Sequence, residues 1–286
     1  MSDGRLLDGV TETLLIPLWA RAEESLRPDG LIRDPWAVRL RDAMDFDFNR
    51  LSAGWKTQLG IAIRTWLVDR EVTAYLARHP GGTVVTLGCG LDARSLRMDN
   101  GLARWFDLDL PDAIALRGGW FPSSDRHHPI AASALDQSWL NMVPTDPPPL
   151  FIAEGLFMYL PEEDLRNLLS AMAERFPGAV LLAEIMSRAL AVGTVRHDVI
   201  SQFDTNFQSG LDDGREFERW HPAIRLTAQW SHVDFCHRRW RWLGWLGWLP
   251  FVRRAARICR LTFQDTCPIG NEDASRPAAR LTLTSP

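Results

Sequence analysis

The chain contains 286 residues, of which 46% are hydrophobic and 24% are charged. These fractions are typical of a folded globular protein and exclude a disordered chain, and no apolar run approaches the roughly 18 residues that span a bilayer. The formal net charge of −4 leaves no basic footprint for a phosphate backbone, so nucleic acid is not an expected partner.

The cysteines and the N-terminus indicate the compartment. No two of the four cysteines form a CxxC pair, and the first residues lack the basic, apolar and small-residue order of a signal peptide. We therefore expect a cytoplasmic protein without a metal site and without a transmembrane segment. The cysteines are Cys89, Cys236, Cys259 and Cys267.

The first 80 residues are predicted to be helical. Apolar residues recur at helical spacing in 14–19 and again in 61–72, and turns that contain proline and glycine separate the two segments. The second helix, which starts at about Gly60, is expected to end at His79–Gly82 because proline cannot continue it. We interpret residues 1–80 as an N-terminal helical lid that belongs to the same domain as the rest.

The chain then changes to short apolar runs that are typical of buried parallel strands. The first, Thr83–Leu87, is rich in β-branched residues and is bounded by glycines. Four more runs follow, with helical or loop stretches between them. This alternation predicts an α/β fold with a doubly wound, mostly parallel sheet and helices on both faces. The further strands are expected at 104–110, 128–132, 150–153 and 179–185.

After residue 190 the pattern is less regular. We expect an insertion at 190–260 that forms a pocket for the substrate, within a core that spans 81–286. Inside it, two stretches are predicted to be helical, a third to pass from helix to strand, and a fourth to be a basic helix. These stretches are 192–207, 214–220, 224–235 and 252–260.

The most informative segment is a glycine turn directly after the first strand, Leu87-Gly88-Cys89-Gly90-Leu91-Asp92-Ala93-Arg94. Two glycines let the backbone bend sharply and let a ligand approach main-chain N–H groups. The next strand ends in Phe106-Asp107-Leu108-Asp109, and Asp109 lies 21 residues after Gly88, the separation at which an acid binds ribose hydroxyls. The pattern indicates an adenosine ligand without a 2′-phosphate. Alternatively, the glycines only form a tight turn and Asp109 caps a helix.

NAD and S-adenosylmethionine both fit this much, since Gly-x-Gly-x-x-Ala is an allowed dinucleotide variant. Three features favour S-adenosylmethionine: the long helical lead-in, the Glu154-Gly155 pair after the strand at 150–153, and the absence of a second mononucleotide half. No histidine or tyrosine motif of a dehydrogenase is visible. An NAD-dependent oxidoreductase remains the alternative.

Three motifs carry a family resemblance. They are Thr86–Arg94, Phe106–Pro111 and Ala153–Pro161, the last reading Ala-Glu-Gly-Leu-Phe-Met-Tyr-Leu-Pro. Together they resemble the leucine carboxyl methyltransferase family, and more closely its bacterial branch, typified by the tetracenomycin polyketide O-methyltransferase. The resemblance covers about residue 10 to residue 265. It implies a class I methyltransferase fold and S-adenosyl-L-methionine as the cofactor.

The resemblance implies roles for the nucleoside side of the site. Gly88 and Gly90 would wrap the methionine part of the cofactor, and Asp109 would bind the ribose. The adenine-contacting stretch matches 132–136, but this sequence lacks the Asp-Leu pair of the eukaryotic pattern, so the choice among its residues stays open. The candidates are Ser133, Ala134 and Asp136.

The resemblance also implies partners for the amino-acid part of the cofactor. Arg64, five residues before Asp69, would form a salt bridge with the cofactor carboxylate, which a planar guanidinium can grip at two points. Arg21 would assist it. Glu154 and Gly155 would lie beneath the cofactor at the fourth strand. A solvated Arg64 on an amphipathic helix is the alternative.

We expect methyl transfer to oxygen, on a carboxylate or hydroxyl of a small, polyketide-like or aromatic natural product. A carboxylate, with a pKa of about 4, is already ionised, whereas a phenol, with a pKa of about 10, benefits from a base. Tyr159 and His197 are the candidate catalytic residues. The other candidate bases are His221, His232 and His237, because histidine is the side-chain type whose ordinary pKa lies near neutrality.

The tryptophan-rich run 240–251 allows three interpretations. It forms a hydrophobic lid over a planar acceptor, or an interfacial amphipathic helix with the following arginines, or ordinary core. A second class of function therefore stays open, an inactive methyltransferase-like scaffold that docks a partner or a membrane through this run. For the enzyme we expect a small-molecule acceptor as partner and a monomer or homodimer. The arginines are Arg253, Arg254, Arg257 and Arg260.

Overall fold

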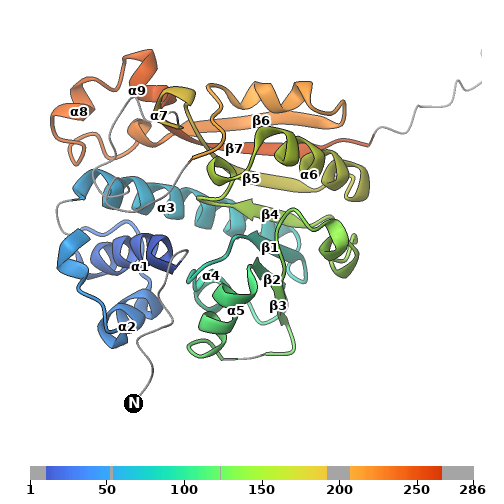
Figure 1. Ribbon diagram of the computed structural model, residues 1–286, viewed down its shortest axis with the longest axis horizontal. Coiled ribbons are helices and arrows are strands. Elements are labelled where there is room, and N and C mark those ends of the chain that lie inside the picture. Colours follow the sequence, from blue (N-terminus) through green and yellow to red (C-terminus); the bar gives the residue numbers. More distant parts are fainter. Residues whose placement is uncertain (1–10, 52–53, 123, 192–206, 266–286) are drawn as a thin grey trace, which may run out of the picture.

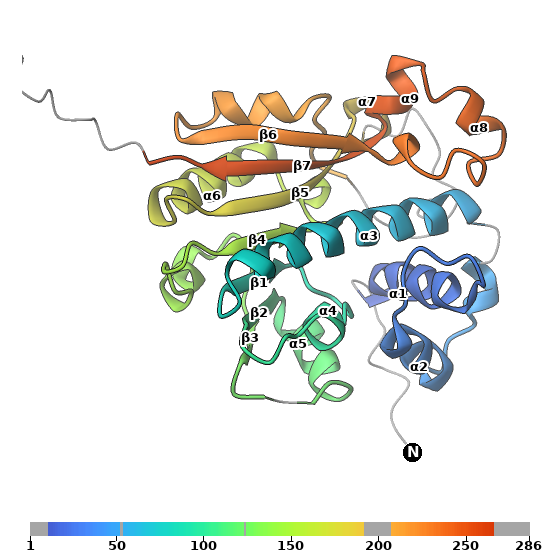
Figure 2. The same cartoon turned by 180° about the vertical axis from the view of Figure 1, so that it is seen from behind.

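A seven-stranded sheet with helices on both faces forms the body of the protein (Figures 1 and 2). The computed structural model describes residues 11–51, 54–122, 124–191 and 207–265. The strand order is β3-β2-β1-β4-β5-β7-β6. Neighbouring strands from β3 to β5 are parallel, and β7 is antiparallel to both of its neighbours, β5 and β6. The strands are β1 (Thr83–Leu87), β2 (Arg104–Asp109), β3 (His127–Ala131), β4 (Leu150–Ala153), β5 (Val180–Met186), β6 (Ile224–Ser231) and β7 (Ala256–Phe263).

The doubly wound α/β prediction is confirmed, and the first strand has the predicted bounds. Successive residues of a strand face opposite sides, so an unbroken apolar run is buried on both. Val84 packs in the cluster formed with helix α3 (Trp55–Arg78), which runs in front of the sheet in Figure 2. Val85 packs in the cluster formed with α6 (Glu162–Arg175) on the other face.

The N-terminal helices lie beside the carboxyl edge of the sheet (Figure 1). They are α1 (Thr11–Leu26), α2 (Pro35–Ala43), the short 3-10 helix η1 (Phe48–Leu51) and α3, which begins five residues before the predicted Gly60. Asp34 caps α2 by accepting a hydrogen bond from the Ala37 N–H at 2.9 Å. The predicted turn after α1 is present, with the N–H of Gly30 donating to the Arg27 carbonyl at 3.2 Å. The predicted turn after α3 is present as well, with the N–H of Gly82 donating to the His79 carbonyl at 2.8 Å.

The C-terminal part differs from the prediction. The basic helix expected over 252–260 is wrong, because only α9 (Pro250–Arg254) is helical there and the chain continues as β7. Burial of Ile258, Cys259 and Leu261 against both faces of the sheet outweighs the local helical spacing. The stretch 224–235 begins directly as strand β6 instead of as a helix. The helix expected at 192–207 lies, except for its last residue, outside the described residues.

The remaining helical elements connect the strands or follow them. None of the helices in the described ranges has both the length and the apolar character needed to cross a bilayer. These elements are α4 (Arg94–Arg97), α5 (Pro111–Gly118), η2 (Gln137–Met142), η3 (Phe157–Tyr159), α7 (Arg188–Ala191), η5 (Gly214–Arg219), η6 (His232–Asp234) and α8 (Trp242–Trp245).

Candidate active site

The glycine turn between β1 and α4 has the backbone that only glycine adopts easily. Gly88 and Gly90 have φ values of +65° and +46°, in the left-handed region. The N–H of Gly88 donates to the Leu108 carbonyl at 2.8 Å, which ties the turn to β2. A Cβ on Gly90 would come within 3.0 Å of the Leu14 side chain of α1. The turn therefore presents bare backbone beneath the N-terminal helices.

Asp109 stands at the carboxyl end of β2 beside this turn. Its carboxylate accepts hydrogen bonds from the N–H of Gly90 at 2.7 Å and of Leu110 at 2.8 Å. Burial raises the pKa of Asp109, and the Gly90 hydrogen bond offsets part of the rise. Asp107 is instead buried against the guanidinium of Arg117. Of the two carboxylates in the motif, only Asp109 is available at the edge of the sheet.

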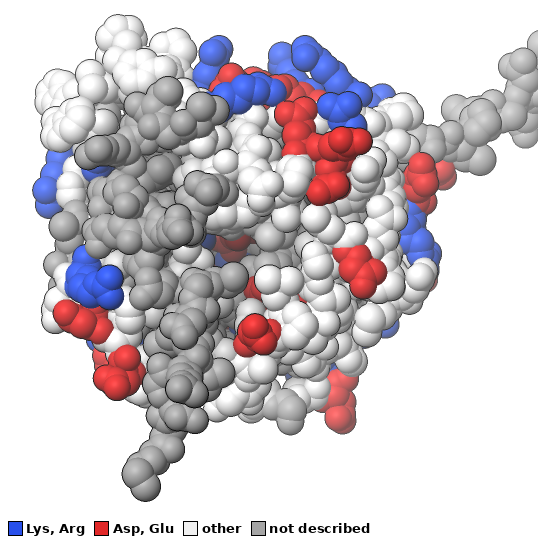
Figure 3. All heavy atoms as spheres, viewed as in Figure 1, with Lys and Arg blue, Asp and Glu red and all other residues white. Residues whose placement is uncertain are grey.

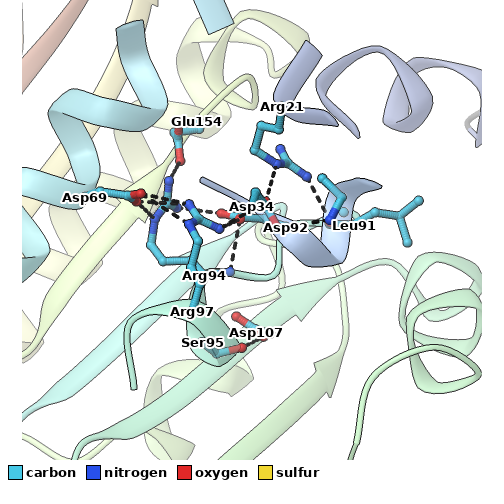
Figure 4. Close-up of polar contacts among 12 residues, drawn as sticks. Arg21, Asp34, Asp69, Leu91, Asp92, Arg94, Ser95, Arg97, Asp107 and Glu154 are labelled. Atoms are coloured by element: carbon cyan, nitrogen blue, oxygen red, sulfur yellow. Dashed lines mark hydrogen bonds and ion pairs between the residues drawn. The ribbon is translucent and has the colours of Figure 1, made fainter. Parts of the chain in front are cut away.

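A buried ionic cluster lies under the turn (Figure 4). The guanidinium of Arg94, which is 2% exposed, contacts Asp69 at 2.8 Å, Asp92 at 2.6 Å and Glu154 at 2.5 Å. Arg97 contacts Asp69 at 3.0 Å and Asp92 at 2.8 Å. Burial by itself would raise the pKa of Asp92, but Arg94 and Arg97 hold it well below its usual range. The cluster therefore stays charged at neutral pH.

Arg21 connects helix α1 to this cluster. Its Nε donates to Asp34 at 3.1 Å, and its Nη2 donates to the Leu91 carbonyl in the glycine turn at 2.9 Å (Figure 4). Arg97 also contacts Asp34, at 3.4 Å. Arg21 thus fixes the N-terminal helices over the turn.

Arg64 of α3 continues the cluster toward the fifth strand. Its Nη1 lies 2.6 Å from Oε2 of Glu184, and its Nε lies 3.5 Å from Oε1 of Glu154. Oε2 of Glu184 also accepts the N–H of Gly155 at 2.7 Å. Gly155 has a φ of +65°, and a Cβ there would lie 3.3 Å from the guanidinium of Arg64. Arg64 is therefore held between two acids.

Sequence reasoning missed Glu184. A charged residue in the middle of an apolar strand, Val180–Met186, was the available signal, because such a residue is buried only with a partner. Burial raises the pKa of Glu184, and Arg64 lowers it in part. A connected set of buried or half-buried ion pairs therefore contains four arginines and five acids: Arg21, Arg64, Arg94, Arg97, Asp34, Asp69, Asp92, Glu154 and Glu184.

A cavity of about 710 Å³ opens above the cluster. It runs from the glycine turn, between α1 and α3, to the tryptophan-rich segment. The structure brings together most of the predicted site residues in its wall: Arg21, Arg64, Gly88, Gly90, Glu154, Gly155 and Tyr159. Asp109, Ser133, Ala134 and Asp136 are not in this wall, and His197 lies outside the described residues.

The predicted adenine-contacting residues follow β3 next to Asp109. The N–H of Ala132 donates to the Asp109 carbonyl at 2.9 Å, so the stretch begins beside the acid. Ser133 accepts from the N–H of Leu135 at 3.2 Å, and the exposed Asp136 caps η2 by accepting from Ser138 at 3.0 Å. Both side chains therefore already have local partners.

Tyr159 and His232 are two further titratable groups in the wall of the cavity. The ring centroids of Tyr159 and Phe207 lie 5.2 Å apart, with the rings tilted by 44°. Burial raises the pKa of Tyr159. His232 is buried, and burial together with the charge of Arg64 lowers its pKa to about 3. Its Nε2 lies 3.9 Å from Oε1 of Glu184 and has no hydrogen-bond partner in the described part of the chain.

The tryptophan-rich run combines two of the predicted interpretations. Trp240 is buried and donates to the Phe235 carbonyl at 3.0 Å, as core does. Trp242 and Phe251 line the cavity, as a lid does. Trp245 and Trp248 project into solvent.

Comparison with known proteins agrees with these observations. Residues 15–173 match the leucine carboxyl methyltransferase family model. The chain is 33% identical over 265 residues to the tetracenomycin polyketide synthesis O-methyltransferase TcmP of Streptomyces glaucescens, which covers 90% of this chain and 98% of that protein. It is 31% identical over 249 residues to the S-adenosyl-L-methionine-dependent methyltransferase dpfgK of Gibberella zeae, covering 78% and 82%.

A solved structure from Thermobifida fusca YX, described as that of a methyltransferase, has a similar fold. The TM-score is 0.52, with 15% identity over 86% of this chain and 94% of that chain. At this identity the likeness concerns the fold alone.

Proposed function

This chain belongs to the leucine carboxyl methyltransferase family, and from that premise we propose that it methylates an oxygen atom of a small, largely apolar acceptor. It is a methyltransferase with S-adenosyl-L-methionine as its cofactor. The nicotinamide alternative and the inactive scaffold have no support from the family or from its relatives. For this enzyme we place the reaction in the cytoplasm, with a monomer or homodimer as the working form.

The cofactor, when bound, supplies a methyl group activated by a sulfonium. Gly88 and Gly90 line the cavity without side chains, so the turn fits a close approach of the cofactor to the main chain. Asp109 would accept hydrogen bonds from the ribose hydroxyls, and Arg64, whose buried Nε donates no hydrogen bond to any described residue, would bind the carboxylate. Glu154 and Gly155 would lie beneath the cofactor. Ser133, Ala134 and Asp136 stay the candidates for adenine contact.

Charge supports this arrangement. The buried cluster has one more acid than arginine, while a ligand with a sulfonium, an ammonium and a carboxylate carries one net positive charge at neutral pH. Glu154 and Glu184 both line the cavity, where an ammonium would otherwise be desolvated without compensation. The cluster therefore suits this cofactor better than a dinucleotide, whose pyrophosphate is anionic.

The chain has mainly to align the acceptor oxygen with the methyl group and to exclude water. The helical lid at 1–80 and the insertion at 190–260 would enclose the acceptor. An acceptor hydroxyl must lose its proton as its oxygen takes the methyl group. Nε2 of His232 has no hydrogen-bond partner among the described residues and can accept a hydrogen bond that orients this hydroxyl, but its lowered pKa makes it a weak acceptor for the proton itself. Tyr159 and His197 remain the candidates to receive the proton, and a carboxylate acceptor needs no base.

The observation that carries the proposal is the composition of the cavity wall, which joins the glycine turn and the charged cluster to many apolar side chains. Met158, Val233, Trp242 and Phe251 are among these apolar residues, and together they suit an aromatic ring system, although Lys56 and Thr57 also belong to the wall. The relative TcmP methylates oxygen in tetracenomycin polyketide synthesis, which agrees with a polyketide-like acceptor.

Radiolabelled methyl transfer tests the proposal. The enzyme is incubated with methyl-labelled cofactor and with naphthols, naphthoic acids and hydroxynaphthoic acids. We expect label in an organic extract, and treatment with base separates the two oxygen classes, since an ester releases volatile methanol and an aryl ether does not. Label found only on an added amine or thiol would contradict O-methylation.

A further inference from the structure

Four large aromatic side chains project into solvent from one short stretch of the chain. Trp242 is 61% exposed, Trp245 83%, Trp248 73% and Phe251 69%. We call these four the aromatic platform. They lie on α8 and α9 and on the loop between them, whereas the other exposed large hydrophobic residues in the described ranges are scattered over the molecule. An apolar surface this concentrated indicates a surface that another body covers.

The charge around the aromatic platform indicates what that body is. Residues 235–256 contain five arginines and no acidic residue, although the whole chain has a net charge of −4. Arg253 pairs with Asp234 at 2.6 Å and Arg239 with Glu24 at 2.6 Å. The exposed Arg238, Arg241 and Arg254 therefore form the basic rim. In Figure 3 the region of α8 and α9 is a white surface with blue atoms of Lys or Arg at its margins. An apolar patch with a basic rim complements an anionic, amphipathic surface.

We propose that the aromatic platform docks onto an anionic phospholipid bilayer. Tryptophan prefers the boundary between headgroups and acyl chains, because its ring is apolar and its N–H is polar. The arginines of the rim then reach the lipid phosphates. A symmetric dimer through the same patch would bring two basic rims together, which disfavours a second copy as the occupant.

The aromatic platform contributes to the wall of the cavity. Trp242 and Phe251 belong both to the exposed surface and to the cavity wall, whereas Trp245 and Trp248 belong to the surface alone. Docking would therefore place this part of the cavity wall next to the lipid. If the proposed function holds, an apolar acceptor dissolved in the bilayer reaches the site without crossing water; the docking itself does not depend on that function.

Vesicle sedimentation tests the docking without any acceptor. The full chain is spun with sucrose-loaded vesicles of phosphatidylcholine alone or mixed with phosphatidylglycerol. We expect it to pellet with the mixed vesicles and much less with the neutral ones. The W245S/W248S variant, which leaves the cavity wall intact, should bind the mixed vesicles about tenfold more weakly or worse. The R238Q/R254Q variant should lose about fivefold per arginine and the preference for anionic lipid.

Matched controls make the result specific. Leu102 and Met142 are also large, apolar and exposed, but lie far from the aromatic platform in sequence, so L102S/M142S should bind as the wild type does. Equal binding by W245S/W248S, or wild-type protein that stays in the supernatant, would overturn the proposal. So would sedimentation velocity that shows a dimer lost in W245S/W248S without vesicle binding, or retention on single-stranded RNA in place of vesicles.

Discussion

Nη1 of Arg64 lies 2.6 Å from Oε2 of Glu184, although 120 residues separate them in the sequence. This contact joins the longest N-terminal helix to the centre of β5 directly beneath the cavity. Both side chains are about nine-tenths buried, so each depends on the other for compensation of its charge. The pair therefore links the stability of the fold to the shape of the site.

Replacing Glu184 with glutamine should destabilise the protein. The amide keeps the shape but leaves the buried charge of Arg64 with less compensation, so the free energy of unfolding should fall by about 3 kcal/mol. The control E162Q removes an exposed partner of Arg166 and should cost less than about 1 kcal/mol. Urea unfolding of both variants measures this, and equal losses would contradict the role of the buried pair.

Replacing Arg64 with lysine should weaken binding at one end of the ligand only. Lysine keeps the charge but loses the planar fork, so affinity for adenosylhomocysteine should fall by about tenfold or more. Affinity for methylthioadenosine, which lacks the amino-acid part, should not change. Calorimetry with both ligands measures this, with R70K on the exposed side of the same helix as control. If both affinities fall together, Arg64 only shapes the site.

Replacing Asp109 with alanine should weaken adenosylhomocysteine binding by about tenfold, because two hydrogen bonds to the ribose are lost. The neighbouring Asp112 is exposed, so D112A provides a matched control for the change in charge. Unchanged affinity in D109A would remove the ribose assignment. A melting temperature close to that of the wild type would show that the turn has kept its structure.

His232 should make the protein sensitive to acid. Its pKa is lowered to about 3 in the folded protein, against an ordinary value of about 6.5, so only the unfolded chain takes up the proton between these values. Stability from this group is therefore present at neutral pH and is lost as pH falls below 6.5. Between pH 7 and pH 5 the wild type should lose about 2 kcal/mol more than H232Q.

The exposed His237 provides the control for that measurement, since H237Q should keep the acid sensitivity of the wild type. In activity assays H232Q should slow methylation of a naphthol and leave methylation of a naphthoic acid nearly unchanged. Equal slowing of both would assign His232 a packing role.

The parallel part of the fold was predictable because local sequence determines it. Thr83–Leu87 is an apolar run between glycines, and the turn after it requires glycine at both positions for reasons of backbone geometry. The link from this turn to Asp109 follows from spacing alone, because adjacent parallel strands bring their carboxyl ends together.

The parts that were missed depend on distant partners. Ala256–Phe263 forms a strand because β5 and β6 pair with it, and the local arginine and apolar spacing favoured a helix. The role of Glu184 depends on Arg64, which no nearby residue indicates. The split of the tryptophan-rich run into core, cavity wall and exposed surface depends on which neighbours each ring meets in the folded chain.

β7 has a consequence for biosynthesis. This strand lies between β5 and β6, yet among the described strands it is the last to leave the ribosome. Until it emerges, the nascent chain presents β5 with one unpaired edge, the kind of template on which other chains aggregate. Folding of the sheet is therefore completed only after translation has passed residue 263, and a stop codon before residue 256 yields a chain that cannot close its own sheet.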